Sequence, residues 1–173
     1  RSHATTFETM AELDDYDFST GDAGASHVFN SEAGQIRVGG YMCIKEKPCK
    51  VTNVSTSKTG KHGHAKCNFT ALDIFTNKKY EDIVPATHNA HIPFVVRKDF
   101  DLIDISEDDF LTLMTDEGDM REDIKLPEHP ENYARELKNA FEAAQEKGSS
   151  LSVSVLAAMG HEQVMSHKEV AEK

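Results

Sequence analysis

The sequence predicts a mostly β protein built from two small barrels, and three observations support this prediction. Short runs of β-branched and aromatic residues recur along the chain and are separated by turn residues. The charge changes abruptly near residue 96, where a basic region gives way to an acidic one. One long amphipathic segment, residues 130–147, interrupts the second set of strands. A chain of 173 residues is long enough for two small domains.

The first 24 residues differ from the rest of the chain in composition. They contain six acidic residues and a single Arg, together with Ser, Thr, Gly and Ala, and they show no sustained period. Segments of this kind do not bury enough apolar surface to offset the entropy cost of ordering them. The sequence therefore predicts a disordered acidic tail over residues 1–24.

Strand signals begin at residue 35, within the basic region. Strands are expected at residues 35–38, 41–44, 49–54, 67–75 and 80–84. Pro48 has no amide hydrogen, so it should lie at a strand start or at a sheet edge. Short strands at this spacing are typical of a small SH3-like β-barrel, which we assign to residues 25–96. Residues 89–98, which contain Pro93, are expected to form the linker.

The acidic region after the linker combines strands with a helix. Strands are expected at residues 100–105, 110–114, 120–126 and 151–156, a helix at 130–147, and a short helix at the C-terminus. One stripe of the longer helix is apolar and comprises Tyr133, Leu137, Ala140, Phe141 and Ala144. Lys147, a cation in the last turn, and Gly148 after it are expected to end the helix. Three strands, a helix and a further strand predict an OB-fold domain at residues 97–173.

Charge and composition exclude several functional classes. The net charge of −11 argues against indiscriminate binding to nucleic acid, and no DNA partner is expected. Residues 25–96, however, hold nine Lys or Arg against five acids, which favours an RNA site of defined shape. No apolar run approaches the roughly 18 residues of a membrane span, so no membrane partner is expected. The three cysteines form no C-x-x-C pair and fit reduced thiols of a cytoplasmic protein.

A basic segment between two strand-like runs is the strongest functional signal. Residues 57–66 contain three Lys and two His around two Gly, with no acid and no large apolar residue. This pattern predicts a β-hairpin whose turn uses the freedom of Gly60 and Gly63 to adopt positive φ. Lys61 would then lie at the apex of a narrow cationic arm. Four residues of strand would carry it roughly 13 Å beyond the body of the protein.

Residues 55–66 closely resemble the hypusine loop of the eukaryotic translation initiation factor 5A family. The likeness continues through residues 73–83, 85–89 and 121–127 and covers roughly residues 25–170. It implies the SH3-like and OB-fold domains predicted above. It also implies that Lys61 receives an aminobutyl group from spermidine through deoxyhypusine synthase, and that deoxyhypusine hydroxylase completes hypusine. No other cofactor is expected.

The resemblance further implies a cytoplasmic translation factor and not an enzyme. Such a factor would bind the ribosome near the exit-tRNA site, contact rRNA, and direct Lys61 toward the acceptor end of peptidyl-tRNA. It would promote termination and elongation through stalling sequences such as consecutive prolines. The rest of the ribosome- and tRNA-binding loop would be Lys58, Thr59, Gly60, His62, Gly63, His64 and Lys66.

The residues alone also allow two other interpretations of the basic segment. It could belong to a general RNA-binding or RNA-chaperone module, whose affinity would persist without modification and fall with salt. Alternatively, His62, His64 and Cys67 could bind a metal ion in an enzyme, because two His and a nearby thiol are zinc ligands. We expect no metal, because no further ligand pair has the spacing of a metal site.

Overall fold

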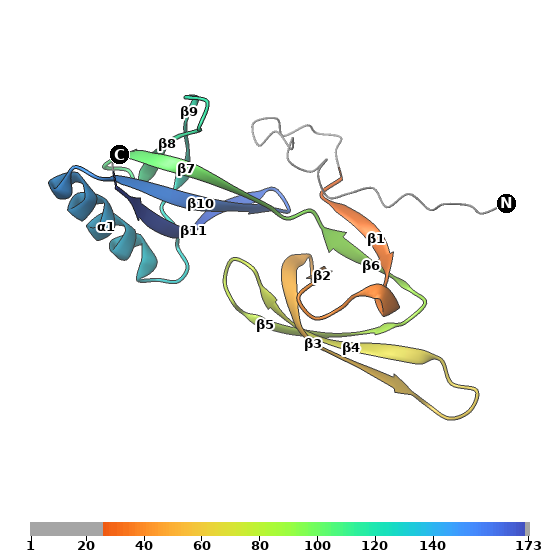
Figure 1. Cartoon of the computed structure of the whole chain (residues 1–173). Helices are drawn as coiled ribbons and strands as arrows, with labels where there is room; N and C mark the ends of the chain where they lie inside the picture. Colours follow the sequence, from red (N-terminus) through yellow and green to blue (C-terminus); the bar gives the residue numbers. More distant parts are fainter. Residues whose placement is uncertain (1–25, 172–173) are drawn as a thin grey trace.

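The computed structural model describes residues 26–171 and contains two β units, with the chain passing from one to the other between β6 and β7 (Figure 1). In the first unit, an antiparallel sheet has the order β2-β3-β4-β5, and β1 pairs with β6 beside it. These elements are β1 (Val28–Glu32), η2 (Ala33–Gln35), β2 (Tyr41–Ile44), β3 (Lys47–Lys58), β4 (Ala65–Asp73), β5 (Lys79–Pro85) and β6 (Asn89–Pro93). Together they form an N-terminal half-barrel, which is consistent with the SH3-like barrel predicted from the sequence.

The core of the first unit is formed by the inward faces of its strands. Its buried members are Ala33, Ile36, Met42, Ile44, Cys49, Val51, Cys67, Phe69, Ala71 and Ala90. A two-residue turn joins β2 to β3, with Lys45 at φ 51° and Glu46 at φ 62°. Two consecutive residues with positive φ give the turn the twist that a tight hairpin needs. Pro48 lies near the start of β3, as the sequence predicts.

Two predictions for the first unit are wrong. Residues 35–38 form no strand, since η2 ends at Gln35 and the chain then turns through Gly39, whose N–H donates to the Val51 carbonyl oxygen. Residues 89–98 are not a linker, because Asn89–Pro93 is strand β6, which pairs along its whole length with β1. Only Phe94 and Val95 separate β6 from β7. Long-range pairing with β1, which the sequence did not reveal, orders this segment.

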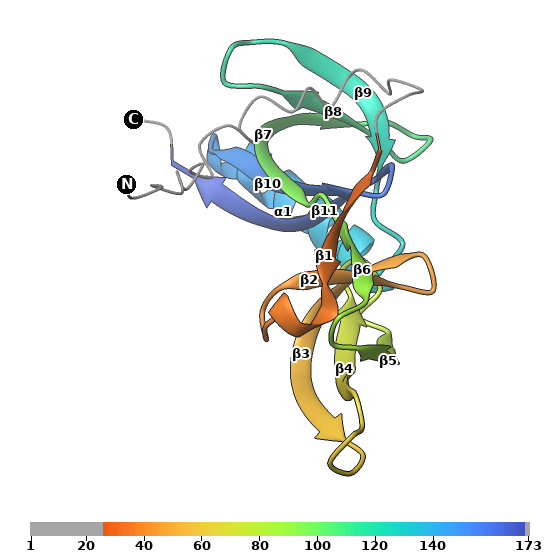
Figure 2. The same cartoon turned by 90° about the vertical axis from the view of Figure 1, so that its right-hand side faces the viewer.

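The second unit is a five-stranded antiparallel sheet with one helix, as expected of an OB-fold domain. Its sheet has the order β11-β10-β7-β8-β9 and curves strongly (Figure 2). The elements are β7 (Val96–Ile105), β8 (Phe110–Met114), β9 (Met120–Lys125), α1 (Tyr133–Lys147), β10 (Ser150–Ala158) and β11 (His161–Val170). The edge strands β9 and β11 are joined by an ion pair between Arg121 and Glu162.

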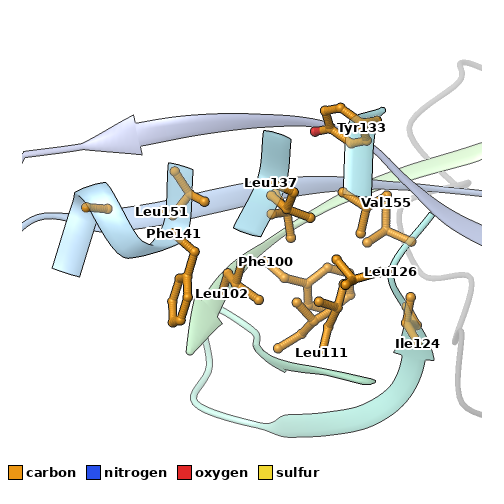
Figure 3. Close-up of a cluster of buried hydrophobic side chains, with 14 residues drawn as sticks. Phe100, Leu102, Leu111, Ile124, Leu126, Tyr133, Leu137, Phe141, Leu151 and Val155 are labelled. Atoms are coloured by element: carbon orange, nitrogen blue, oxygen red, sulfur yellow. The ribbon is translucent and has the colours of Figure 1, made fainter. Parts of the chain in front are cut away.

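Helix α1 packs its apolar stripe against the sheet (Figure 3). Tyr133, Leu137, Phe141 and Ala144 are buried, and Ala140 is half-buried, which confirms the predicted stripe. The helix ends at Lys147, and Gly148 adopts φ 70° with its N–H donating back to the last turn. That left-handed stop suits Gly, which has no Cβ to clash. The facing strands contribute Phe100, Leu102, Leu111, Leu113, Ile124, Leu151, Val153, Val155 and Val164.

The predicted C-terminal helix is wrong, because residues 161–170 form strand β11. A tight turn at Met159 (φ 53°) and Gly160 (φ 73°) reverses the chain, and β11 then pairs with β10 over its full length. Glu, Gln, Met and Lys in this segment favour a helix locally. Pairing with a buried strand outweighs that local preference, which is worth only a few tenths of a kcal/mol per residue, roughly.

Three further observations concern the sequence predictions. The acidic tail predicted at residues 1–24 lies outside the described residues. All three cysteines are free: Cys49 and Cys67 are buried and Cys43 is half-buried, in agreement with the expectation of reduced thiols. Between residues 26 and 171, no helix has both the length and the apolar character needed to cross a bilayer.

Candidate functional site

Strands β3 and β4 continue past the core of the first unit as a projecting hairpin, which we call the arm (residues 55–68; Figures 1 and 2). The two strands remain paired to the end, with Ser57 opposite Lys66 and Lys58 opposite Ala65. Along β3, every residue from 55 to 58 is exposed. Cys67, at the base of the arm on β4, still points into the core, but beyond it the hairpin has no large apolar side chain to bury and projects into solvent.

Cross-strand hydrogen bonds reinforce the arm where it lacks a core. The Asn68 side-chain amide donates to the Ser55 carbonyl oxygen and to Ser57 Oγ, both at 3.4 Å. Nearer the body, a bulge at Thr52 shifts the register, and Thr52 Oγ1 donates to the Thr70 carbonyl oxygen at 3.0 Å. A bulge increases the local twist of a hairpin. These contacts hold the two strands together between the core and the tip.

The tip of the arm is a short loop, residues 59–64, that depends on two glycines for different reasons. Gly60 adopts φ +68° and has open space around it, which fits the prediction of a positive φ. Gly63 is not among the residues with positive φ, so that expectation is wrong for Gly63. Instead, a Cβ on Gly63 would overlap the carbonyl oxygen of Thr59. The Gly63 N–H also donates to the Gly60 carbonyl oxygen at 3.4 Å.

The lysines of the arm are placed on both of its faces and at its end. Lys58, Lys61 and Lys66 are all exposed. Because consecutive strand residues point to opposite faces, the pairing of Ser57 with Lys66 puts Lys66 and Lys58 on opposite faces of the hairpin. Among the described residues, none of these lysines forms an ion pair with a carboxylate. The arm therefore carries uncompensated positive charge on two faces and at its apex.

The structure brings together every residue predicted for the loop. Thr59, Gly60, Lys61, His62, Gly63 and His64 form the tip, and all are exposed except the half-buried Gly63. Lys58 is the last residue of β3, and Lys66 is the second residue of β4. The sequence reasoning missed Asn68, whose side chain ties β4 to β3. The one signal was a residue of low β propensity inside a predicted strand.

The proposed metal ligands do not form a cluster. Cys67 is 3% exposed and points into the core of the first unit, whereas His62 and His64 lie exposed in the tip. Across residues 26–171, no group of three or more His, Cys, Asp or Glu side chains could hold a metal ion. This arrangement gives no support to the alternative of a metal-dependent enzyme at this segment.

Comparison with known proteins places both units in one family. Residues 26–88 match the family model described as translation initiation factor 5A-like, N-terminal. Residues 94–168 match the model described as eukaryotic elongation factor 5A hypusine, DNA-binding OB fold. These matches agree with the two β units seen in the structure.

Individual relatives match over nearly the whole chain. Eukaryotic translation initiation factor 5A-3 of Arabidopsis thaliana is 54% identical over 160 residues, which are 92% of this chain and 98% of that protein. Factor 5A-2 of Solanum lycopersicum is 51% identical over 164 residues, 95% and 99% of the two chains. The solved structure of a translation initiation factor eif-5a family protein from Naegleria fowleri is 46% identical, with a TM-score of 0.75, and covers 83% of this chain and 99% of that one.

Proposed function

Because this chain belongs to the eukaryotic translation initiation factor 5A family, we propose that it acts on the ribosome through a hypusine formed at Lys61. The chain is a translation factor, and that family is not one of classical enzymes. The observation that carries the proposal is the position of Lys61. Its amine lies at the apex of a projecting arm, exposed and without a carboxylate partner among the described residues.

The modification is a transfer to the Lys61 amine followed by an oxidation. Deoxyhypusine synthase breaks the bond between the aminobutyl group and the secondary nitrogen of spermidine, and that carbon becomes bonded to Lys61 Nζ. The displaced diaminopropane carries the proton that Nζ loses, so this transfer is redox-neutral. Deoxyhypusine hydroxylase then converts one C–H of the new chain to C–OH. The oxygen atom comes from dioxygen, and an external two-electron donor reduces the second oxygen to water.

The loop supports this chemistry through access and shape. Exposure of the tip lets a modifying enzyme reach Nζ, and Gly60 and Gly63 put no side chain beside it. The finished side chain is longer than lysine and carries two amines and a hydroxyl. Each amine can donate to phosphate or ribose oxygens that lysine would not reach. Lys58, Thr59, His62, His64 and Lys66 add contacts to the RNA backbone around it.

On the ribosome, the arm enters from the exit-tRNA site and contacts rRNA and the acceptor end of peptidyl-tRNA. Its cationic side chain restrains an acceptor end that is otherwise misplaced, as it is at consecutive prolines and at termination. The ribosome then transfers the peptide between better-aligned reactants, so the factor acts by positioning and electrostatics. Action takes place in the cytoplasm, with residues 25–96 presenting the arm and residues 97–173 forming the second domain.

A charge-preserving substitution tests the proposal. We expect Lys61→Arg to keep the positive charge but to remove both modification and activity in a reconstituted translation system that stalls on consecutive prolines. Lys58→Arg is the matched control, since it also keeps its charge and lies beside the tip. Both variants are prepared together with the two modifying enzymes, and peptide mapping reports the mass of residue 61. Relief of stalling by Lys61→Arg at the wild-type level would show the proposal to be wrong.

A further inference from the structure

Phe75 joins the two units of the molecule. It follows the last residue of β4 by two positions and is only 7% exposed. Its side chain lies in a small cluster with Leu156 and Ala158, which belong to β10 of the second unit. Ile74, Val95 and Met165 pack around them. This cluster is separate from the cores of the two units and contains residues of both, so it contributes to the contact between them.

Asp73 shapes the loop that presents Phe75. Its side chain is buried, and Oδ1 accepts hydrogen bonds from the N–H groups of Phe75 at 2.8 Å and Thr76 at 3.2 Å. A carboxylate that accepts two backbone N–H groups fixes the chain direction at that point. Asn77, at φ 60°, completes the turn by donating its N–H to the Asp73 carbonyl oxygen at 2.9 Å. Phe75 is thus held at a defined place beyond the end of β4.

Two residues of β11, in the second unit, contact Phe75. The His161 ring meets the Phe75 ring edge-on, with centroids 4.5 Å apart and planes at 89°. Gln163, 6% exposed, donates through Nε2 to the His129 carbonyl oxygen at 2.8 Å and, over a long 3.5 Å, to that of Phe75. Edge-to-face aromatic contacts are favourable beyond their buried area.

Cavities lie beside Phe75 in the contact between the two units, so the loss of its side chain should weaken that contact. Phe75 and Thr76 line two cavities between the units, of about 560 Å³ and about 300 Å³. Outside the Phe75 cluster, contacts between the units include Met159, whose Sδ lies 3.8 Å from Cys43 Sγ, and Gly160, which lies beside the His27 ring. Within the part of the chain that the structure describes, Phe75 is the one aromatic residue of the interdomain cluster, and it lies beside both cavities.

Strand β4 connects this contact to the arm. The strand begins at Ala65, directly after the tip, and ends at Asp73, two residues before Phe75. Nine residues of strand span roughly 30 Å, and β4 is paired on both sides by β3 and β5. A paired strand bends little, so the orientation of the OB-fold domain at one end determines where the tip points at the other.

We propose that Phe75 is a positioning residue, which couples the arm to the OB-fold domain so that the two reach their binding partner as one rigid unit. The functional part of this inference rests on the proposed function, because it assumes that Lys61 and the second domain engage the ribosome together. Without the Phe75 contact, each domain keeps its own core, but the arm samples many directions. Binding then carries the entropy cost of restoring the productive orientation.

Measurement of domain motion in the free protein tests the coupling without reference to function. NMR relaxation of the unmodified wild type should fit one rotational diffusion tensor for both domains. The relaxation data of Phe75→Ala, and of the milder variant His161→Ala, should require a separate diffusion tensor for each domain. The amide chemical shifts of both cores should stay unchanged, because each domain remains folded. Phe110→Ala is the matched control, since Phe110 is half-buried on β8 outside the interdomain cluster and both core clusters. Independent tumbling of the wild type, or a single tensor for both variants, would overturn the coupling.

Translation kinetics test the positioning role. With fully modified protein, Phe75→Ala should raise the factor concentration for half-maximal relief of stalling by about tenfold, within the usual range of coupling between sites. The maximal rate should stay unchanged, because the tip itself is intact. If wild type fails to relieve stalling, the proposed function is wrong, while the NMR result still decides the coupling. If wild type is active and Phe75→Ala matches it in concentration dependence, Phe75 has no positioning role.

Discussion

The carbonyl oxygen of Thr59 lies in the space that a side chain on Gly63 would need. This contact fixes the shape of the tip more firmly than the positive φ of Gly60, which has open space around it. The two glycines therefore impose different requirements on the same loop. Gly60 supplies a backbone conformation, which other residues adopt at a modest cost. Gly63 permits a close approach of two backbone segments, which no other residue allows.

Gly63→Ala is expected to disrupt the tip without unfolding the protein. The added methyl group forces residues 59–63 apart, whereas the strands below stay paired and both cores lie elsewhere. The NMR shifts of the tip should change, the melting temperature should not, and modification of Lys61 should fall. Gly60→Ala is the control and should cost about 1–2 kcal/mol, from its positive φ, while leaving the tip free of a backbone overlap. Equal modification of the two alanine variants would contradict this explanation.

Arg121 is expected to be important for closure of the second unit. It forms ion pairs with Glu162 on β11 at 2.6 Å and with Asp123 at 2.7 Å, and its side chain is only 17% exposed. Burial raises the pKa of Glu162 although Arg121 opposes the shift, while the hydrogen bond from Arg121 lowers the pKa of Asp123. Removal of Arg121 would leave the partly buried Glu162 carboxylate without its partner.

Arg121→Ala should therefore destabilise the protein by about 2 kcal/mol, less than the loss of one partner from a fully buried ion pair, because both side chains are partly exposed. Urea denaturation at neutral pH measures this change. Lys138→Ala is a useful comparison, because its pair with Asp109 is exposed on both sides and should contribute less than about 1 kcal/mol. Similar losses of unfolding free energy in the two variants would mean that burial of the Arg121 pair does not increase its contribution to stability.

The structure shows why sequence patterns located the arm but not the elements that orient it. Strand propensity, glycine positions and charge are local properties, and they predict the hairpin, the positive φ of Gly60 and the end of α1, but not the close approach of Thr59 to Gly63. Strand β6 has the local composition of a linker, because the strand that pairs with it, β1, lies some 60 residues earlier in the chain. The short C-terminal helix that local composition predicts does not form, because this segment pairs with β10, which is a tertiary effect. Phe75 looked like an ordinary strand residue, since its role depends on β10 and β11.

Tyr133 is expected to make stability depend on pH in the alkaline range. Its hydroxyl lies 2.8 Å from His167 Nδ1, and burial, with a smaller effect of Glu136, raises the pKa of Tyr133 to about 12. In the unfolded chain the phenol ionises near its ordinary value of about 10. The folded pKa is the higher one, so the stabilising effect is fully present below about pH 10 and is lost as the pH rises toward about 12.

The free energy of unfolding measured between about pH 9 and about pH 11 checks this prediction. Tyr133→Phe should lose about 1 kcal/mol at neutral pH, from the missing hydrogen bond, and should show a flatter decline above pH 10. Absorbance of the ionised phenol gives the pKa in the folded state directly. The same alkaline decline in wild type and variant would assign the effect to other groups.

The salt dependence of RNA binding separates a guided translation factor from a general RNA-binding module. Each phosphate neutralised by a lysine contributes about 0.7 to the slope of log affinity against log salt for single strands. Replacing both Lys58 and Lys66 by Gln should thus lower the slope by about 1.4 for an RNA oligonucleotide with a tRNA acceptor end. Lys79 and Lys138 already pair with carboxylates, so the same double replacement there should leave the slope unchanged.

The proposed function also requires hypusine at Lys61 to strengthen binding, because the longer side chain reaches further oxygens. Equal affinity of modified and unmodified protein, with the slope change intact, would favour the general RNA-binding module instead.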